Sequence, residues 1–273
     1  MSQDDYFLGM PRQNTYGNYR PAYETQEVPF DHWWPMYSKA MYILARTFQP
    51  KTPEDTKAIQ VFFVNLFKLV PNSSARSYLA QFYVMKPNII ALLKSTVPGV
   101  FQSYYWLEDM LVNRPQEFHQ MCFQNADKQA LFLWVYLIHV MFLGAINTQQ
   151  HTVKYPIPTL SHQRSLYQVE QMDIKDWGNA FWFVLHTSAL YAPREMEDSF
   201  KNYRNVIIAL QYLLPCPKCR EHLKQNLKWI DFDTCGRTNL ELFKCSWKLH
   251  NIVNQSINKP LLDLQLALSL YTF

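Results

Sequence analysis

Two cysteines three residues apart, Cys216 and Cys219, are the residues of this chain best placed to do chemistry. Pro215 ends the apolar segment before them, and Pro217 suits the first turn of a new helix that Cys216 begins. A thiolate at a helix start is stabilised by unpaired backbone N–H groups and by the positive end of the helix dipole, so its pKa falls. The spacing therefore predicts a reactive dithiol that can close into a disulfide.

The same cysteines allow other interpretations. Cys216, Cys219, Cys235 and Cys245 follow the pattern C-x2-C-x15-C-x9-C, which could form a zinc site, with His222 replacing one thiolate. The nine residues between Cys235 and Cys245 weaken this interpretation, because structural zinc sites usually have the second pair of ligands as close together as the first. A thioredoxin-like motif would follow a strand, and no strand pattern precedes the first cysteine. The remaining alternative is that these are ordinary buried cysteines.

Two further motifs flank the cysteine pair. Upstream, G-x3-W-x3-H comprises Gly178, Trp182 and His186; downstream, H-N-x-x-N occupies residues 250–254 and Lys259 follows. Taken alone, each motif has an ordinary explanation. A tryptophan and a histidine one helical turn apart could stack inside a core, and the downstream polar residues could form a satisfied helix face.

Taken in order, the three motifs closely resemble the Erv/ALR family of flavin sulfhydryl oxidases, from Asp176 to Phe273. The resemblance implies an all-α C-terminal bundle of four or five helices that holds FAD without a glycine-rich phosphate loop. It also implies thiol-containing protein substrates and molecular oxygen as reaction partners. By resemblance the cofactor-binding residues are Gly178, Trp182, His186, Tyr191, His250, Asn251, Asn254 and Lys259.

The resemblance further implies that Cys216 and Cys219 have different roles in the reaction. Cys216 exchanges disulfides with the substrate, Cys219 passes the electrons to the flavin, and reduced flavin converts oxygen to hydrogen peroxide. The competing hypothesis is a non-enzymatic, zinc-stabilised helical interaction protein, whereas the oxidase has no metal in its site.

The chain departs from the common family pattern in two respects. Many members carry a second, shuttle pair of cysteines, and none is found here, because Cys122 is alone and we expect it to be a buried thiol. Many cellular members also hold a structural disulfide that ends three residues before the H-N motif, where this chain has Trp247. Cys235 and Cys245 are the candidates for such a disulfide, and the sequence leaves their pairing open.

The rest of the chain is globular in composition, with 48% hydrophobic and 18% charged residues and a net charge of +4. Basic residues form no run, so we expect no nucleic-acid partner. We expect a mobile arm over residues 1–30, a helical domain of unknown role over 31–146, a linker over 147–168 and the oxidase domain over 169–273. Prolines at positions 71, 87, 98 and 115 should end helices of the first domain.

The segment Ala130–Ile146 is apolar enough to be weighed as a membrane span, but at 17 residues with a central histidine it is expected to be a buried helix. Residues 1–30 lack the apolar core of a secretory signal.

Some large-DNA-virus oxidases of this family carry an additional helical domain, which is sometimes a degenerate copy of the flavin bundle. The helical first domain of this chain and its missing shuttle pair resemble that group, of the baculovirus type. A viral enzyme would act in host cytoplasm or nucleus, or in the virion. We also expect a homodimer, unless the first domain covers the apolar stripes of residues 177–191 and 198–214.

Overall fold

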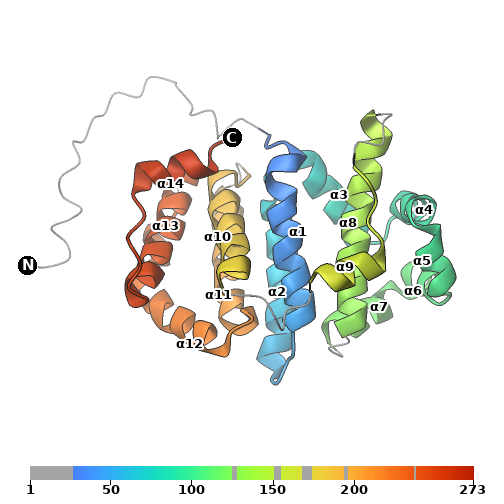
Figure 1. Cartoon of the computed structure of the whole chain (residues 1–273), viewed down its shortest axis with the longest axis horizontal. Coiled ribbons are helices and arrows are strands. Elements are labelled where there is room, and N and C mark those ends of the chain that lie inside the picture. The colour runs from blue at the N-terminus through green and yellow to red at the C-terminus, as the bar shows by residue number, and fades with distance from the viewer. Residues whose placement is uncertain (1–26, 125–127, 151–154, 168–173, 194–195, 237) are drawn as a thin grey trace, which may run out of the picture.

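The computed structural model describes residues 27–124, 128–150, 155–167, 174–193, 196–236 and 238–273, and within these ranges it contains helices and no strand (Figure 1). The all-α prediction is therefore confirmed. The helices are α1 (Phe30–Thr47), α2 (Pro53–Leu69), α3 (Ser73–Tyr83), α4 (Pro87–Thr96), α5 (Pro98–Ser103), α6 (Leu107–Val112), α7 (Pro115–Phe123), α8 (Lys128–Gln150), α9 (Leu160–Leu166), α10 (Ile174–Leu190), α11 (Met196–Leu213), α12 (Pro217–Asn226), α13 (Asn239–Ser256) and α14 (Leu264–Tyr271), with 3-10 turns η4 (Leu227–Trp229) and η5 (Phe232–Thr234).

Prolines set the boundaries of many helices. Helices α2, α4, α5, α7 and α12 each begin at a proline, whose missing N–H costs nothing in the first turn. At α2, Thr52 adds a capping box with Asp55. Helix α11 begins at Met196, so Asp198 and Ser199 lie in its first turn, and the Ser199 hydroxyl donates to the Pro193 carbonyl at 3.0 Å.

The N-terminal and C-terminal helices pack along two long contacts, α1 against α10 and α2 against α11, which lie at the centre of the molecule (Figure 1). Their buried residues form one continuous core. The apolar stripes of α10 and α11 are therefore covered by helices of the same chain, which is one of the two arrangements expected for them. A homodimer stays a prediction and would use another surface.

Polar side chains fix the position of the two groups of helices within that core. The buried Tyr37 hydroxyl of α1 lies 2.6 Å from the Ser188 hydroxyl and 3.1 Å from the Thr187 hydroxyl of α10. In the second contact, the Asn205 amide of α11 donates to the Asn65 amide oxygen of α2 at 3.1 Å. Buried polar groups are costly without partners, so these bonds favour one register of the helices over others.

Helix α8 contains the segment that was weighed as a membrane span. Among the described residues it is the one helix that length and composition would allow to cross a membrane, over Gln129–Thr148, and 83% of that window is buried inside the fold. The surroundings of α8 are thus those of a core helix. It continues to Gln150, and α9 also lies inside the predicted linker of residues 147–168, so much of that linker is helical. Of the predicted arm, residues 1–26 lie outside the described residues.

Candidate functional site

Cys216 and Cys219 form a disulfide at the N-terminus of α12, with their Cα atoms 5.1 Å apart. Cys216 is the N-cap residue, and the backbone N–H of Cys219 donates to its sulfur at 3.2 Å. Both residues are partly exposed. The predicted helix start is confirmed, and its physical consequence follows: when the pair is reduced, a helix N–H and the helix dipole stabilise negative charge on the Cys216 sulfur.

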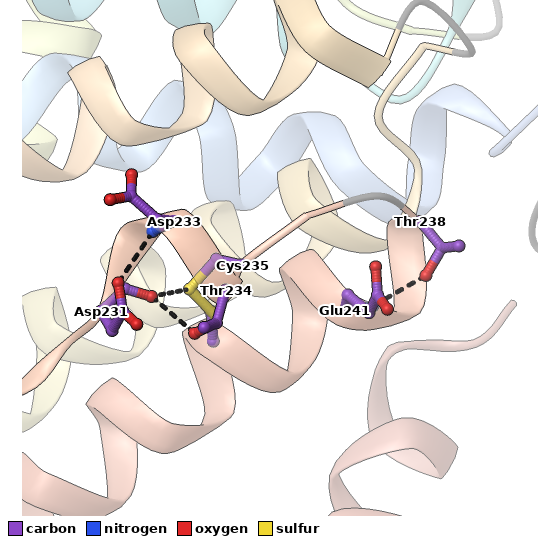
Figure 2. The surroundings of a disulfide bond; sticks show 7 residues. Asp231, Asp233, Thr234, Cys235, Thr238 and Glu241 are labelled. Carbon is purple, nitrogen blue, oxygen red and sulfur yellow. Dashed lines mark hydrogen bonds between the residues drawn. A yellow bond between two sulfur atoms is a disulfide. The ribbon is translucent and has the colours of Figure 1, made fainter.

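The remaining cysteines are arranged in a way that does not suit a four-thiolate zinc site. Cys235 and Cys245 form a second disulfide, with Cα atoms 5.8 Å apart, and Cys122 is buried in α7. Figure 2 shows Cys235 beside the η5 turn, with its sulfur 3.3 Å from the carbonyl oxygen of Asp231, which accepts a hydrogen bond from the Thr234 hydroxyl at 2.9 Å. No three metal-ligating side chains gather anywhere in the described part of the chain.

Helices α10 and α13 bring the two flanking motifs together. The Asn239 amide at the start of α13 donates to the carbonyl oxygens of Leu190 and Ala192 at the end of α10, at 2.8 and 2.9 Å, so the two helices run antiparallel. Along their contact, the rings of Trp182 and His250 stack in parallel, with centroids 4.0 Å apart and 6° between the planes.

The two histidines of these motifs form a hydrogen-bonded pair. Nε2 of His186 lies 2.9 Å from Nδ1 of His250. Burial lowers the pKa of both rings, that of His250 to about 4. The positive charge of Lys259 lowers the pKa of His250 further, and the pKa of His186 falls further because a protonated His250 would repel a second positive charge. Both rings are therefore neutral at neutral pH.

The tautomers of this neutral pair follow from which ring nitrogens have partners. Nδ1 of His186 is buried and bonds to no described atom, and a bare nitrogen is less costly there than an unpaired N–H. His186 then carries its proton on Nε2 and donates it to Nδ1 of His250. This leaves the proton of His250 on its Nε2, so the ring at the edge of the stack is a neutral hydrogen-bond donor.

The rim of the stack carries the other predicted cofactor residues. Asn254 is partly exposed, and Lys259 is exposed just beyond the end of α13. Both amide atoms of Asn251 are already bonded to the backbone of Leu262, at 2.8 and 2.9 Å, so Asn251 fixes the segment that follows α13. At the start of α10, a Cβ on Gly178 would meet no atom within 4 Å, which leaves open space beside that helix.

Two aromatic residues of α14 and the C-terminus were missed by sequence reasoning. The ring of Tyr271 lies 4.6 Å from that of His186, and burial raises the pKa of its hydroxyl to about 12. The hydroxyl of Tyr191, whose contact with the cofactor stays a prediction, accepts a hydrogen bond from the Phe273 backbone at 3.0 Å. Nothing in the sequence of these last residues indicates which helix they pack against.

Residues 179–271 match the model of the Erv1 / Alr family. A protein of Invertebrate iridescent virus 3, named as an FAD-linked sulfhydryl oxidase, is 34% identical over 90 residues, covering 33% of this chain and 61% of the viral protein. The FAD-linked sulfhydryl oxidase ERV1 of Oryza sativa is 32% identical over 89 residues, 32% of this chain and 45% of the plant protein. A protein of Frog virus 3 with a similar name is 28% identical over 101 residues, 35% of this chain and 65% of the viral one.

The resemblance to the Erv/ALR family predicted from the motifs is thus confirmed for the C-terminal third, and the chain spans less than two thirds of these relatives. No solved structure gives a significant match.

Proposed function

We propose that this protein is an FAD-dependent thiol oxidase, which forms disulfides in protein substrates through Cys216 and Cys219 and reduces oxygen to hydrogen peroxide. The observation that carries this proposal is the disulfide at the N-terminus of α12, inside the segment that matches the Erv1 / Alr family. The names of the relatives, which are FAD-linked sulfhydryl oxidases, support the same activity.

The residues of the α10–α13 contact fit FAD. A dinucleotide needs a flat apolar surface for its rings and a few polar groups at the edge. The Trp182–His250 stack is partly exposed and supplies the flat surface, while Asn254, Lys259 and the proton on His250 supply donors for ribose or phosphate oxygens. His186 is fully buried, so we assign it an indirect role, in which it orients His250 and fixes its tautomer.

The protein residues divide the chemistry as follows. A substrate thiolate attacks the sulfur of Cys216, the bond to Cys219 breaks, and Cys219 leaves as a thiolate. A second substrate thiolate then attacks the mixed disulfide and releases Cys216, whose negative charge the Cys219 N–H and the α12 dipole stabilise. When bound, FAD accepts the two electrons of the reduced pair and passes them to oxygen.

The purified protein tests this proposal through its visible absorbance and its oxygen consumption. We expect the yellow colour of oxidised flavin, and oxygen uptake with formation of hydrogen peroxide when dithiothreitol is added. A colourless protein that contains one equivalent of zinc and consumes no oxygen would contradict the proposal and favour the interaction-protein hypothesis.

We further propose that the enzyme is viral and acts in host cytoplasm or nucleus or in the virion; two of the relatives above are viral proteins. Localisation of the tagged chain in infected cells tests this, and a purely extracellular signal would contradict it.

A further inference from the structure

The exposed surface that follows the redox disulfide is strongly basic. It comprises the outward face of α12 and the η4 turn, and we call it the α12 face. Lys218, Lys224 and Lys228 are exposed on it, whereas Leu223 on the opposite side of α12 is buried. Residues 217–229 contain four basic residues and one acidic residue, a net charge of +3, against +4 for the whole chain of 273 residues. Most of the excess positive charge is therefore concentrated beside the disulfide.

These charges are not neutralised within the described residues. None of the ion pairs seen among the described residues, such as Lys94–Glu108 and Arg114–Asp109, involves Lys218, Lys224 or Lys228. The single acidic residue, Glu221, accepts a hydrogen bond from the Gln225 amide at 3.1 Å. Unneutralised lysines on one helix face create a local positive potential that attracts acidic partners.

The same surface ends in an exposed tryptophan. The side chain of Trp229 is 70% exposed, whereas Trp33 and Trp134 are fully buried. A large exposed aromatic ring beside charged residues is typical of protein interaction sites, where tryptophan contributes strongly to binding. Figure 1 shows α12 at the outer edge of the C-terminal helices, away from the N-terminal group, so a partner can approach it.

We propose that the α12 face binds an acidic, extended segment next to the reactive cysteines of a protein substrate. This inference rests on the proposed oxidase function and names its substrate class. Helix α12 has 10 residues and η4 has 3, which places Trp229 about 20 Å from Cys216 along the axis. An extended chain covers that distance in about six residues. The acidic stretch should thus be about six residues long, with an apolar or aromatic residue at its far end.

Binding on this face also assists the exchange reaction, because it holds the substrate cysteines beside Cys216 and so raises their local concentration there. In one exchange the substrate loses two electrons and two protons and gains a disulfide, while the pair gains the two electrons as two thiols or thiolates.

The test compares three reduced dithiol peptides that differ in the residues flanking their cysteines, with about six glutamates, glutamines or lysines on each side. With the flavin-loaded protein at low salt, we expect kcat/KM to be about tenfold higher for the glutamate peptide than for the glutamine peptide, and lowest for the lysine peptide. The preference should shrink at high salt. A glutamate peptide with serines in place of cysteines should bind the oxidised protein, measured by fluorescence anisotropy.

The variant Lys224→Gln/Lys228→Gln should lose most of the preference for the glutamate peptide and of the anisotropy signal, whereas dithiothreitol should be oxidised as before. Trp229→Ala should weaken binding of a glutamate peptide that ends in phenylalanine. The matched control is Lys57→Gln/Lys68→Gln, which removes two exposed charges from α2 and should change nothing.

The outcomes separate the two proposals. Failure of the wild-type protein to oxidise dithiothreitol would overturn the oxidase proposal. Oxidation of dithiothreitol with equal rates for the three peptides would overturn the proposal for the α12 face and leave the oxidase intact. An equal loss in the α2 control would also overturn it, because the effect would then come from net charge alone.

Discussion

The contact between α1 and α8 in the N-terminal half resembles the contact between α10 and α13 in the C-terminal half. In each, a tryptophan packs on a histidine of the facing helix. Trp34 meets His139 edge-on, with centroids 5.3 Å apart, and the Tyr42 hydroxyl bonds to Nδ1 of His139 at 3.1 Å. Trp182 stacks flat on His250, which bonds to His186.

The two contacts differ in exposure and in what lies beside them. Trp34 is 4% exposed and Tyr42 is fully buried, so of the N-terminal contact the His139 ring alone is partly exposed. Trp182 and His250 are both partly exposed, and the C-terminal helices also carry the Cys216–Cys219 disulfide. Similar residue types thus act as scaffold where the tryptophan is buried, and can bind a ligand where both rings of the stack are accessible.

Loss of the Cys216–Cys219 pair should have the largest effect and should affect the C-terminal half alone. Cys219→Ser is expected to lower oxygen consumption with dithiothreitol at least about 1,000-fold, since it removes the thiolate to which we assign electron transfer and leaves Cys216 without its disulfide partner, while flavin stays bound. Cys122→Ala, in the N-terminal half, should retain the turnover of the folded protein. Full turnover by Cys219→Ser would refute the role given to that residue.

Acid should destabilise both halves through their buried histidines. Burial lowers the pKa of His139 to about 4, as it does for His250, from 6.5. Because the unfolded chain takes up protons first, this stability is fully present above pH 6.5 and is lost as pH falls toward about 4. The loss is on the order of 3 kcal/mol per histidine. Denaturant unfolding across this range measures it, and His139→Gln should flatten the profile.

Removal of the second disulfide should lower stability without changing the chemistry. Cys235 and Cys245 are 10 positions apart, and closing a loop of this size stabilises the fold by about 2–3 kcal/mol on the chain-entropy model. Cys235→Ala/Cys245→Ala should therefore melt at a lower temperature and keep its turnover below that temperature. Lost turnover in the folded variant would show that this pair also carries electrons.

The two histidines offer the sharpest contrast between the halves. His250→Ala should weaken binding of FAD to the apoprotein about tenfold or more, because it removes the stacking surface and a donor. His139→Ala should lower the free energy of unfolding by about 2 kcal/mol, since it leaves the Tyr42 hydroxyl without its partner, and should not change FAD affinity. If His250→Ala and His139→Ala weakened FAD binding equally, the C-terminal contact would not be the one that binds the cofactor.

The smallest expected effect on stability concerns the contact between α1 of the N-terminal half and α10 of the C-terminal half. Tyr37→Phe removes a buried hydroxyl that bonds to Ser188 and Thr187 of α10, and should cost about 1–2 kcal/mol of unfolding free energy. Tyr83→Phe, at a 39% exposed position, is the control and should change stability little. If Tyr37→Phe were neutral, the polar bonds would not be what fixes the two groups of helices.

The local features of this fold were accessible from sequence. Proline positions marked helix boundaries, although Pro87, Pro98 and Pro115, which were expected to end helices, begin the next ones. The run around Cys216 predicted a dithiol at the beginning of a helix that can close into a disulfide, because this depends on neighbouring residues alone. The motifs also named residues that meet in space although they are far apart in the sequence. His250 of α13 contacts Trp182 and His186 of α10, which lie 64 or more residues before it.

Long-range packing could not be predicted in the same way. The sequences of α1 and α2 did not indicate that these helices would cover α10 and α11. An apolar stripe predicts that one face of a helix is buried, but it does not predict which helix packs against that face. Likewise, the pattern around Asn251 did not reveal that its amide would hold Leu262, and the position of Tyr271 against His186 depends on the path of the segment between α13 and α14.

The central claim is that Cys216 and Cys219 form a redox centre coupled to a bound flavin, and anaerobic titration of the flavin-loaded protein with dithionite tests it most directly. A disulfide and a flavin each accept two electrons, so the wild-type protein should take up four electrons, and Cys216→Ser/Cys219→Ser should take up two. Reduction of the wild-type protein by two electrons alone, or a purified protein that cannot be loaded with flavin, would contradict the account.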